Sequence, residues 1–442
     1  MRRIKFLLLI LLPALLLAPA VARARVYIDV TQPFTRKLPL ALPVFDPLQG
    51  AAADPLGREA TDLLKNDLLF TGLFDILPPS AYLGKPQVGA INYARWSKIG
   101  AELLITGNYR LSGGIFTLEL RLYDVGESKL LVGRRYDGRP PDMPAMVHRF
   151  ADEVMLAITG ERSVFSSVIA FVGARQVEKD GRRQVVKEIY LMNFDGSGVR
   201  RFTRRGDIAL YPAWSSDGRF LAYSSYIRRR PAIFVQALDG GTGRVVINKK
   251  GVNITPAFLP GREILGVSLS HTGRSNIYLV NLAGKILKHL TDGWGIEVAP
   301  TFSPDGKKMA FVSDRGGSPQ IYVLDMASGQ VRRLSFGFKY SAAPAWSPRG
   351  DRIAFQAQID GTFQIVTVRP DGSDQQVLTS GWGGGEDPSW SPDGRLIAYA
   401  SRRTGRYQIY VMTASGQPIK RLTSLPGDNT DPAWSPRGVA GK

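Results

Sequence analysis

The chain has 442 residues, with 57 Lys and Arg against 38 Asp and Glu, a formal net charge of +19 and no cysteine. The lack of cysteine excludes disulfides and a cysteine-linked lipid anchor. The excess of positive charge favours polyanions or acidic protein surfaces as partners.

The first 24 residues have the pattern of an export signal. Arg2, Arg3 and Lys5 precede an apolar run over residues 6–18, and small residues follow up to Ala24. This run is shorter than the roughly 20 residues that span a bilayer, so it predicts a cleaved signal peptide over residues 1–24 and not a membrane helix. The mature chain would keep a charge of +15 and lie outside the cytoplasmic membrane, which argues against nucleic acid as its partner.

Residues 25–162 predict an α/β domain. The helix expected over residues 55–71 has its apolar residues on one face, and further helices are expected over residues 91–99 and 143–159, the last with Gly160 as its C-terminal cap. The predicted strands are residues 26–30, 38–45, 102–110, 115–123 and 129–136.

Residues 163–442 contain an internal repeat of 44 residues. Each copy has a phrase close to Pro-Ala-Trp-Ser-Pro-Asp-Gly, and the copies begin at Pro212, Pro256, Pro300, Pro344, Pro388 and Pro432. A repeat of this length, with turn residues between short β-rich runs, is typical of a four-stranded propeller blade. The aromatic residue of each phrase is expected in the core between blades, because it recurs at one blade position.

The two ends of the repeat indicate how the ring closes. The first β-rich run, residues 169–173, has no phrase before it, whereas the last phrase, at Pro432, has no blade after it. We therefore predict an all-β six-bladed β-propeller after the α/β domain, closed by residues 432–435 pairing in the first blade.

No pattern of catalytic residues appears in the chain. The three histidines, His148, His271 and His289, lack the spacing of metal ligands, and no nucleophile elbow, zinc motif or phosphate-binding loop is present. The sequence therefore predicts that the protein is not an enzyme and needs no cofactor. The repeated Asp-Gly pairs fit hairpin turns, and calcium bound to loop carboxylates in the propeller channel stays open as an alternative.

The order of a signal peptide, a small α/β domain and six such blades resembles the Tol-Pal system protein TolB family over essentially the whole chain. This resemblance implies a periplasmic adaptor that is expected to be a monomer. Its propeller would bind the peptidoglycan-associated lipoprotein Pal, and its first mature residues would bind TolA. The complex would support outer-membrane invagination in cell division and outer-membrane integrity.

Matching by position assigns partner contacts on this chain. The Pal-binding loops precede the Pro of each phrase, and the residues expected to contact Pal are Val252, Thr255, Val298, Tyr340, Glu386 and Asn429. The TolA-binding segment would be Arg25, Val26, Tyr27, Ile28, Asp29 and Val30. Its alternating apolar residues suit strand addition to a partner's sheet, although the same pattern suits pairing within its own domain.

Two other functions fit the repeat. The first is a propeller that binds cell-wall glycan through its Trp side chains or its basic rim, and the second is a propeller hydrolase. A hydrolase would need channel residues for catalysis that the sequence does not reveal.

Overall fold

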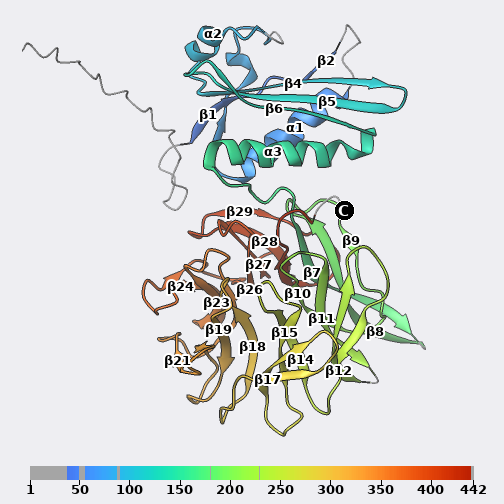
Figure 1. The fold of residues 1–442 in the computed structure, drawn as a ribbon, viewed down its shortest axis with the longest axis vertical. Coiled ribbons are helices and arrows are strands. Elements are labelled where there is room, and N and C mark those ends of the chain that lie inside the picture. The colour runs from blue at the N-terminus through green and yellow to red at the C-terminus, as the bar shows by residue number, and fades with distance from the viewer. Residues whose placement is uncertain (1–36, 49–54, 87–89, 180, 228, 440–442) are drawn as a thin grey trace, which may run out of the picture.

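The computed structural model describes residues 37–48, 55–86, 90–179, 181–227 and 229–439. Figure 1 shows a small α/β unit above a ring of six four-stranded sheets, which confirms the predicted fold class. The predicted signal peptide (1–24) and the predicted TolA-binding segment (25–30) lie outside the described residues. Within the described ranges, no helix has the length and apolar character that crossing a membrane requires.

The N-terminal unit is a six-stranded sheet in the order β3-β1-β4-β5-β6, with β2 paired to β4. Its elements are β1 Leu38–Ala41, β2 Asp46–Pro47, α1 Pro55–Phe70, β3 Phe74–Ile76, a 3-10 turn Pro79–Ala81, α2 Tyr93–Lys98, β4 Leu103–Ser112, β5 Ile115–Asp124, β6 Lys129–Gly138, a 3-10 turn Pro140–Asp142 and α3 Met143–Thr159. The strand predicted over residues 38–45 ends earlier, at Ala41, shortly before Pro43, which has no N–H for a strand ladder. Gly160 caps α3 in the left-handed conformation, as predicted.

Helices α1 and α3 lie side by side between the sheet and the propeller (Figure 1). Each buries one face: Leu64 and Leu68 of α1 and Phe150 and Val154 of α3 are fully buried in a core that extends into the propeller. The predicted domain boundary between residues 162 and 163 falls in the connection from α3 to β7, and it stays a prediction.

The propeller has six sheets of four antiparallel strands. The first blade is β30 Asn429–Trp434, β7 Val168–Lys179, β8 Arg182–Asn193 and β9 Arg200–Arg201; the second is β10 Ala209–Trp214, β11 Phe220–Ile227, β12 Arg230–Ala237 and β13 Arg244–Ile247; the third is β14 Asn253–Phe258, β15 Ile264–Leu269, β16 Asn276–Asn281 and β17 Ile286–His289. The fourth is β18 Glu297–Phe302, β19 Lys308–Ser313, β20 Gln320–Asp325 and β21 Val331–Arg333; the fifth is β22 Ser341–Trp346, β23 Ile353–Ile359, β24 Thr362–Val368 and β25 Gln376–Val377; the sixth is β26 Glu386–Trp390, β27 Leu396–Ser401, β28 Gln408–Thr413 and β29 Pro418–Arg421. The first strand of each sheet contacts the first strand of both neighbouring sheets, so these six inner strands surround the central axis.

The ring closes where the sequence predicts. Strand β30, from the end of the chain, pairs antiparallel with β7, with Trp434 opposite Ile169 and Asn429 opposite Gly173. The Trp434 indole N–H donates to Ser167 Oγ at 2.8 Å, and the Ser435 amide donates to the Val168 carbonyl at 2.9 Å. The first blade is therefore built from both ends of the propeller segment and has no free inner edge.

Two polar contacts explain why the same residues return in each blade. In the turn after β10, Ser215 Oγ donates to Asp217 at 2.7 Å and accepts from the Phe220 amide at 2.9 Å, and Gly218 takes a positive φ of 69°. The second contact lies at the end of the fourth strand, where a hydroxyl oxygen accepts a hydrogen bond from the amide of an Ile in the third strand. In the first blade, Thr203 Oγ1 accepts from the Ile189 amide at 2.9 Å. The hydroxyl thus ties the end of the outer strand to the sheet.

The N-terminal unit meets the propeller through a cluster of aromatic rings. Phe194, in the turn between β8 and β9, makes edge contacts with Phe70, Phe165 and His148 at centroid distances of 5.1, 5.2 and 5.3 Å. Behind it, His148 Nδ1 lies 2.8 Å from Asp67 Oδ2, and both side chains are buried. The acidic partner of His148 lies 81 positions away in the sequence.

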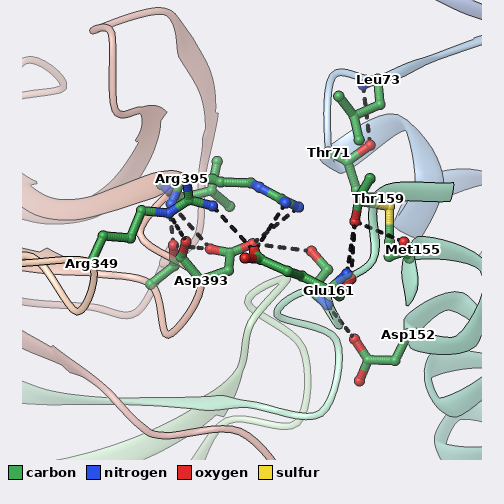
Figure 2. Close-up of polar contacts among 12 residues, drawn as sticks. Thr71, Leu73, Asp152, Met155, Thr159, Glu161, Arg349, Asp393 and Arg395 are labelled. Carbon is green, nitrogen blue, oxygen red and sulfur yellow. Dashed lines mark hydrogen bonds and ion pairs between the residues drawn. The ribbon is translucent and has the colours of Figure 1, made fainter. Parts of the chain in front are cut away.

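A second junction contact lies at the end of α3. Figure 2 shows the Glu161 carboxylate reaching the guanidinium groups of Arg349 and Arg395, at 3.3 and 3.2 Å. Next to it, Ser163 Oγ donates to the buried Asp393 at 3.4 Å, and the Ser163 amide donates to Asp152 at 3.1 Å. These contacts hold the connection between the two units against two turns of the propeller.

Replacing Trp434 tests the ring closure. We expect Trp434→Ala to lower the free energy of unfolding by about 3–5 kcal/mol, because it empties a buried site and leaves β30 without its indole contact. Trp294→Ala is the control, since Trp294 is 86% exposed, and should change stability by no more than about 0.5 kcal/mol. Urea unfolding of both variants gives the comparison; equal losses would contradict closure through β30.

The Asp67–His148 pair predicts a pH-dependent stability. Burial raises the pKa of Asp67 from 3.8 to about 6 against the opposing effect of His148. Burial opposes protonation of His148, but its hydrogen bond with Asp67 and the negative charges of nearby carboxylates together outweigh burial and raise its pKa above 6.5. Both groups hold protons more tightly in the folded chain, so the stabilisation that they contribute is present at low pH and is lost as pH rises through the folded pKa values.

We therefore expect the free energy of unfolding to fall more steeply from about pH 4 to above pH 6.5 in the natural chain than in an Asp67→Asn/His148→Gln variant. Urea unfolding at several pH values measures both slopes. Identical slopes would show that the pair does not titrate as described.

Candidate functional site

The two faces of the propeller have different neighbours. We call the face at the amino ends of the inner strands the loop face, and the face at their carboxyl ends the junction face. Arg349 and Asp393 lie in turns that follow inner strands, and Phe194 lies in the turn after β8, which runs parallel to β30. The N-terminal unit therefore docks on the junction face, and the loops predicted to bind Pal lie on the opposite, loop face.

A repeated backbone distortion shapes the loop face. Each inner strand carries a bulge, and the residue before the Pro of the phrase has a positive φ between 50° and 55°. The six residues are Tyr211, Thr255, Ala299, Ala343, Asp387 and Asp431. The bulge turns the amide of this residue toward the previous blade: Ala299 N donates to Thr255 Oγ1 at 3.2 Å and Asp387 N to Gln356 Oε1 at 2.9 Å. Bulges that re-aim side chains in this way are common at functional rims.

Five of the six predicted Pal contacts are partly exposed at this face: Val252, Thr255, Val298, Tyr340 and Glu386. Thr255 is already engaged by Ser268 at 2.7 Å, and Glu386 accepts from the Tyr407 hydroxyl at 2.6 Å. Asn429 differs because it is fully buried and donates to Gln408 Oε1 at 3.1 Å. Its side chain braces the loop in this structure, and its predicted contact with Pal stays a prediction, as do the other five.

An exposed apolar sector on the loop face was not predicted from the sequence. Trp294 is 86% exposed, Trp382 69% and Phe336 58%, and each lies in the connection that leads from an outer strand to the next inner strand. Ile296 and Tyr340 extend this sector in the same connections. Exposed aromatic residues in three successive connections are typical of a protein interface, because aromatic side chains are enriched there.

An acidic sector lies at the sixth and first blades of the loop face. Burial raises the pKa of Asp387 well above its usual range, and Asp431 and Glu386 raise it further. Burial also raises the pKa of Asp431, whose carboxylate accepts from the Thr430 hydroxyl at 2.7 Å. Partial burial and these carboxyl groups raise the pKa of Tyr211 to about 12, so its hydroxyl stays protonated and can donate a hydrogen bond.

No group of three or more acidic or histidine side chains that could hold a metal ion occurs in the described part of the chain. The Asp-Gly pairs occupy turns, where Asp305 and Asp371 accept hydrogen bonds from Ser303 and Ser373. Calcium in the channel therefore stays a hypothesis of the sequence analysis.

Comparison with known proteins identifies the family. The profile described as the TolB beta propeller domain matches residues 156–439, and that of the TolB amino-terminal domain matches residues 26–131. The chain belongs to the TolB family.

It is 42% identical over 253 residues to the Tol-Pal system protein TolB of Desulfosudis oleivorans, a match that covers 56% of each chain. It is 39% identical over 240 residues to the protein TolB homolog of Chlorobium chlorochromatii, covering 53% of this chain and 52% of the relative. The chain spans about half the length of the curated relatives it matches.

A solved structure extends the TolB match to both units. The crystal structure of TolB from Acinetobacter baumannii superposes with a TM-score of 0.79 and 27% sequence identity, covering 91% of this chain and 97% of that chain. The predicted resemblance to TolB is thereby confirmed, and the chain is a Tol-Pal system protein with a propeller. TolB relatives are Tol-Pal system proteins and not enzymes, in agreement with the sequence prediction.

The strained bulge allows a direct test. Ala343 has a φ of +50°, where a side chain costs energy, so we expect Ala343→Gly to raise the free energy of unfolding by about 1 kcal/mol. Its neighbour Ala342, in β22 without a positive φ, is the matched control, and Ala342→Gly should lower stability by roughly 0.5–1 kcal/mol. Urea unfolding of the pair measures both changes; the same sign for both would contradict the bulge as described.

Proposed function

We propose that this TolB-family protein is a periplasmic adaptor that binds two partners of the Tol-Pal system at separate sites. The loop face of the propeller binds the lipoprotein Pal, and the tail formed by residues 25–30 binds TolA. Through these contacts the protein supports outer-membrane invagination during cell division and outer-membrane integrity. Its periplasmic location follows from the predicted signal peptide and from its membership of the family.

The observation that carries the proposal is the apolar sector on the loop face. Trp294, Phe336 and Trp382 are exposed on a face that does not contact the N-terminal unit in the described structure. Exposed aromatic side chains of this size lose contact with water when a partner covers them, which stabilises a protein complex. The acidic sector beside them provides polar groups that can fix the orientation of a partner.

The glycan-binding alternative receives less support. Five of the six aromatic side chains in the repeated phrase are buried, namely Phe258, Phe302, Trp346, Trp390 and Trp434. Their rings are therefore covered by neighbouring blades and offer no stacking surface to a sugar. The partly exposed Trp214 donates its indole N–H to the Ala433 carbonyl at 2.9 Å, which ties it to the first blade.

Measuring the affinity for purified Pal tests the loop face. We expect Trp294→Ala/Trp382→Ala to weaken binding at least about tenfold, because large aromatic side chains dominate interface energies. Leu287→Ala/Val377→Ala is the control, since these side chains are 45% and 51% exposed on outer strands. Unchanged affinity in the Trp variant, or an equal loss in the control, would contradict the assignment to this face.

In the same assay, deleting residues 25–30 should abolish TolA binding and leave Pal binding unchanged. Loss of both interactions would contradict separate sites. Recovery of glycan and of neither protein from envelope extract would favour the glycan-binding alternative.

A further inference from the structure

A basic cavity lies on the outer side of the propeller, between the first and second blades. It has a volume of about 370 Å³ and is lined by Arg200, Arg201, Arg204, Arg205, Tyr223 and Gly241, among others. One wall is β9 and the connection that follows it, and the other is the turn between β12 and β13. This turn belongs to the junction face, whereas the connection after β9 leads to the loop face. The cavity therefore lies at the outer side of the ring, at other blades than the apolar sector proposed to bind Pal.

The four arginines of the cavity lack acidic partners. None of the ion pairs formed among the described residues includes Arg200, Arg201, Arg204 or Arg205. The nearby buried carboxylate of Glu188 is occupied within its own blade, where it accepts from the Gly206 amide at 2.8 Å and from the Thr203 hydroxyl. Four positive charges around one cavity repel one another, and an anion between them would relieve that repulsion.

Comparison among the blades shows that this cavity departs from the repeat. At a spacing of 44 residues, the positions equivalent to Arg204 hold Asn248, Asp292, Phe336, Ser380 and Ser424, and those equivalent to Arg205 hold Lys249, Gly293, Gly337, Gly381 and Leu425. No other blade has two arginines there. Positions that serve packing keep their residues from blade to blade, so paired arginines in a single blade point to a separate role.

The opposite wall departs from the repeat at Gly243, whereas Gly241 has a glycine counterpart in Gly329. The pair Gly241 and Gly243 corresponds to Lys285 and Leu287, Gly329 and Val331, Ser373 and Gln375, Gln417 and Ile419, and Ser197 and Val199 in the other blades. A Cβ on Gly243 would lie 2.2 Å from the Tyr223 hydroxyl oxygen, so the glycine is what keeps this wall open. The paired arginines on one wall and Gly243 on the other line the same cavity.

Arg205 is held by aromatic side chains of the second blade. Its guanidinium carbon lies 3.9 Å from the centroid of the Phe234 ring, and Phe234 in turn stacks on Tyr223 at 5.6 Å. Stacking occupies the face of the guanidinium group, and the N–H groups that are not hydrogen-bonded to Tyr223 match the oxygens of a phosphate group. The volume falls within the range of about 300–1,000 Å³ found for small-ligand sites.

We propose that this cavity binds a ligand that carries a phosphate or diphosphate group. Four guanidinium groups match a multiply charged anion better than a single carboxylate, and Tyr223 and the backbone of the glycine turn provide further polar groups. The phosphate group belongs either to a soluble molecule or to the headgroup of an anionic lipid, and the experiment separates these two sources.

Calorimetric titration of the full mature chain with pyrophosphate tests the proposal, with sodium acetate at equal ionic strength as the comparison anion. We expect saturable binding of pyrophosphate alone, and about tenfold or greater weakening in Arg204→Gln/Arg205→Gln, because two charge-assisted contacts are lost. Arg200→Gln/Arg204→Gln, which keeps the Arg205 stacking, should weaken binding similarly. The control Arg402→Gln/Arg406→Gln removes the same charge from exposed arginines of the sixth blade and should leave affinity unchanged.

Flotation with vesicles identifies the source. Binding to phosphatidylglycerol vesicles that is absent with phosphatidylcholine, is competed by pyrophosphate and is lost in both cavity variants assigns the site to a lipid headgroup. Pyrophosphate binding without vesicle binding assigns it to a soluble phosphate compound. No binding of either probe, or equal weakening in the cavity and control variants, would overturn the proposal.

Discussion

The pairing of β30 with β7 is the contact on which the rest of the structure depends. A ring of sheets has no edges only when its last blade is joined to its first, and here the join is made within one sheet by strands 267 positions apart at Ser435 and Val168. Both propeller faces are defined by this closure, because it fixes the six inner strands around one axis. The loop face, the junction face and the cavity between the first two blades are all placed by it.

The proline of each phrase restricts the backbone of the residue before it, and this restriction shapes the loop face. A residue before proline is disfavoured in the right-handed helical region, and in this fold it takes the left-handed conformation six times. At Thr255, Ala299 and Asp387, the amide of the bulge donates a hydrogen bond to a side chain of the blade before it. The backbone conformation of these residues is the same in every blade, whereas their side chains vary, for example between Ala343 and Asp387. A constant backbone with variable side chains is what a binding surface on a repeat fold requires.

The sequence predicts the architecture well because its repeat encodes contacts inside and between adjacent blades. The phrase at Pro432 revealed the closure, and five of the six recurring aromatic residues were correctly placed in the core, whereas Trp214 is partly exposed. Contacts between distant positions carry no such pattern, so the Asp67–His148 pair, 81 positions apart, was not foreseen. Exposure is equally hidden. Trp294 and Trp382 share one repeat position with Phe338, and a recurring aromatic residue suggests packing, yet both Trp side chains are exposed. Asn429 looks like a loop residue although it is fully buried.

The placement of Phe194 has a mechanical consequence. This ring belongs to the first blade, the same sheet that holds both ends of the propeller segment, and it is the ring on which the N-terminal helices rest. A pulling force applied between the two units would therefore reach the first blade through Phe194, and the fifth and sixth blades through the contacts of Glu161 with Arg349 and Arg395. The pairing of β30 with β7 lies in the first of these blades, so the hydrogen bonds that close the ring would also bear part of the tension between the units.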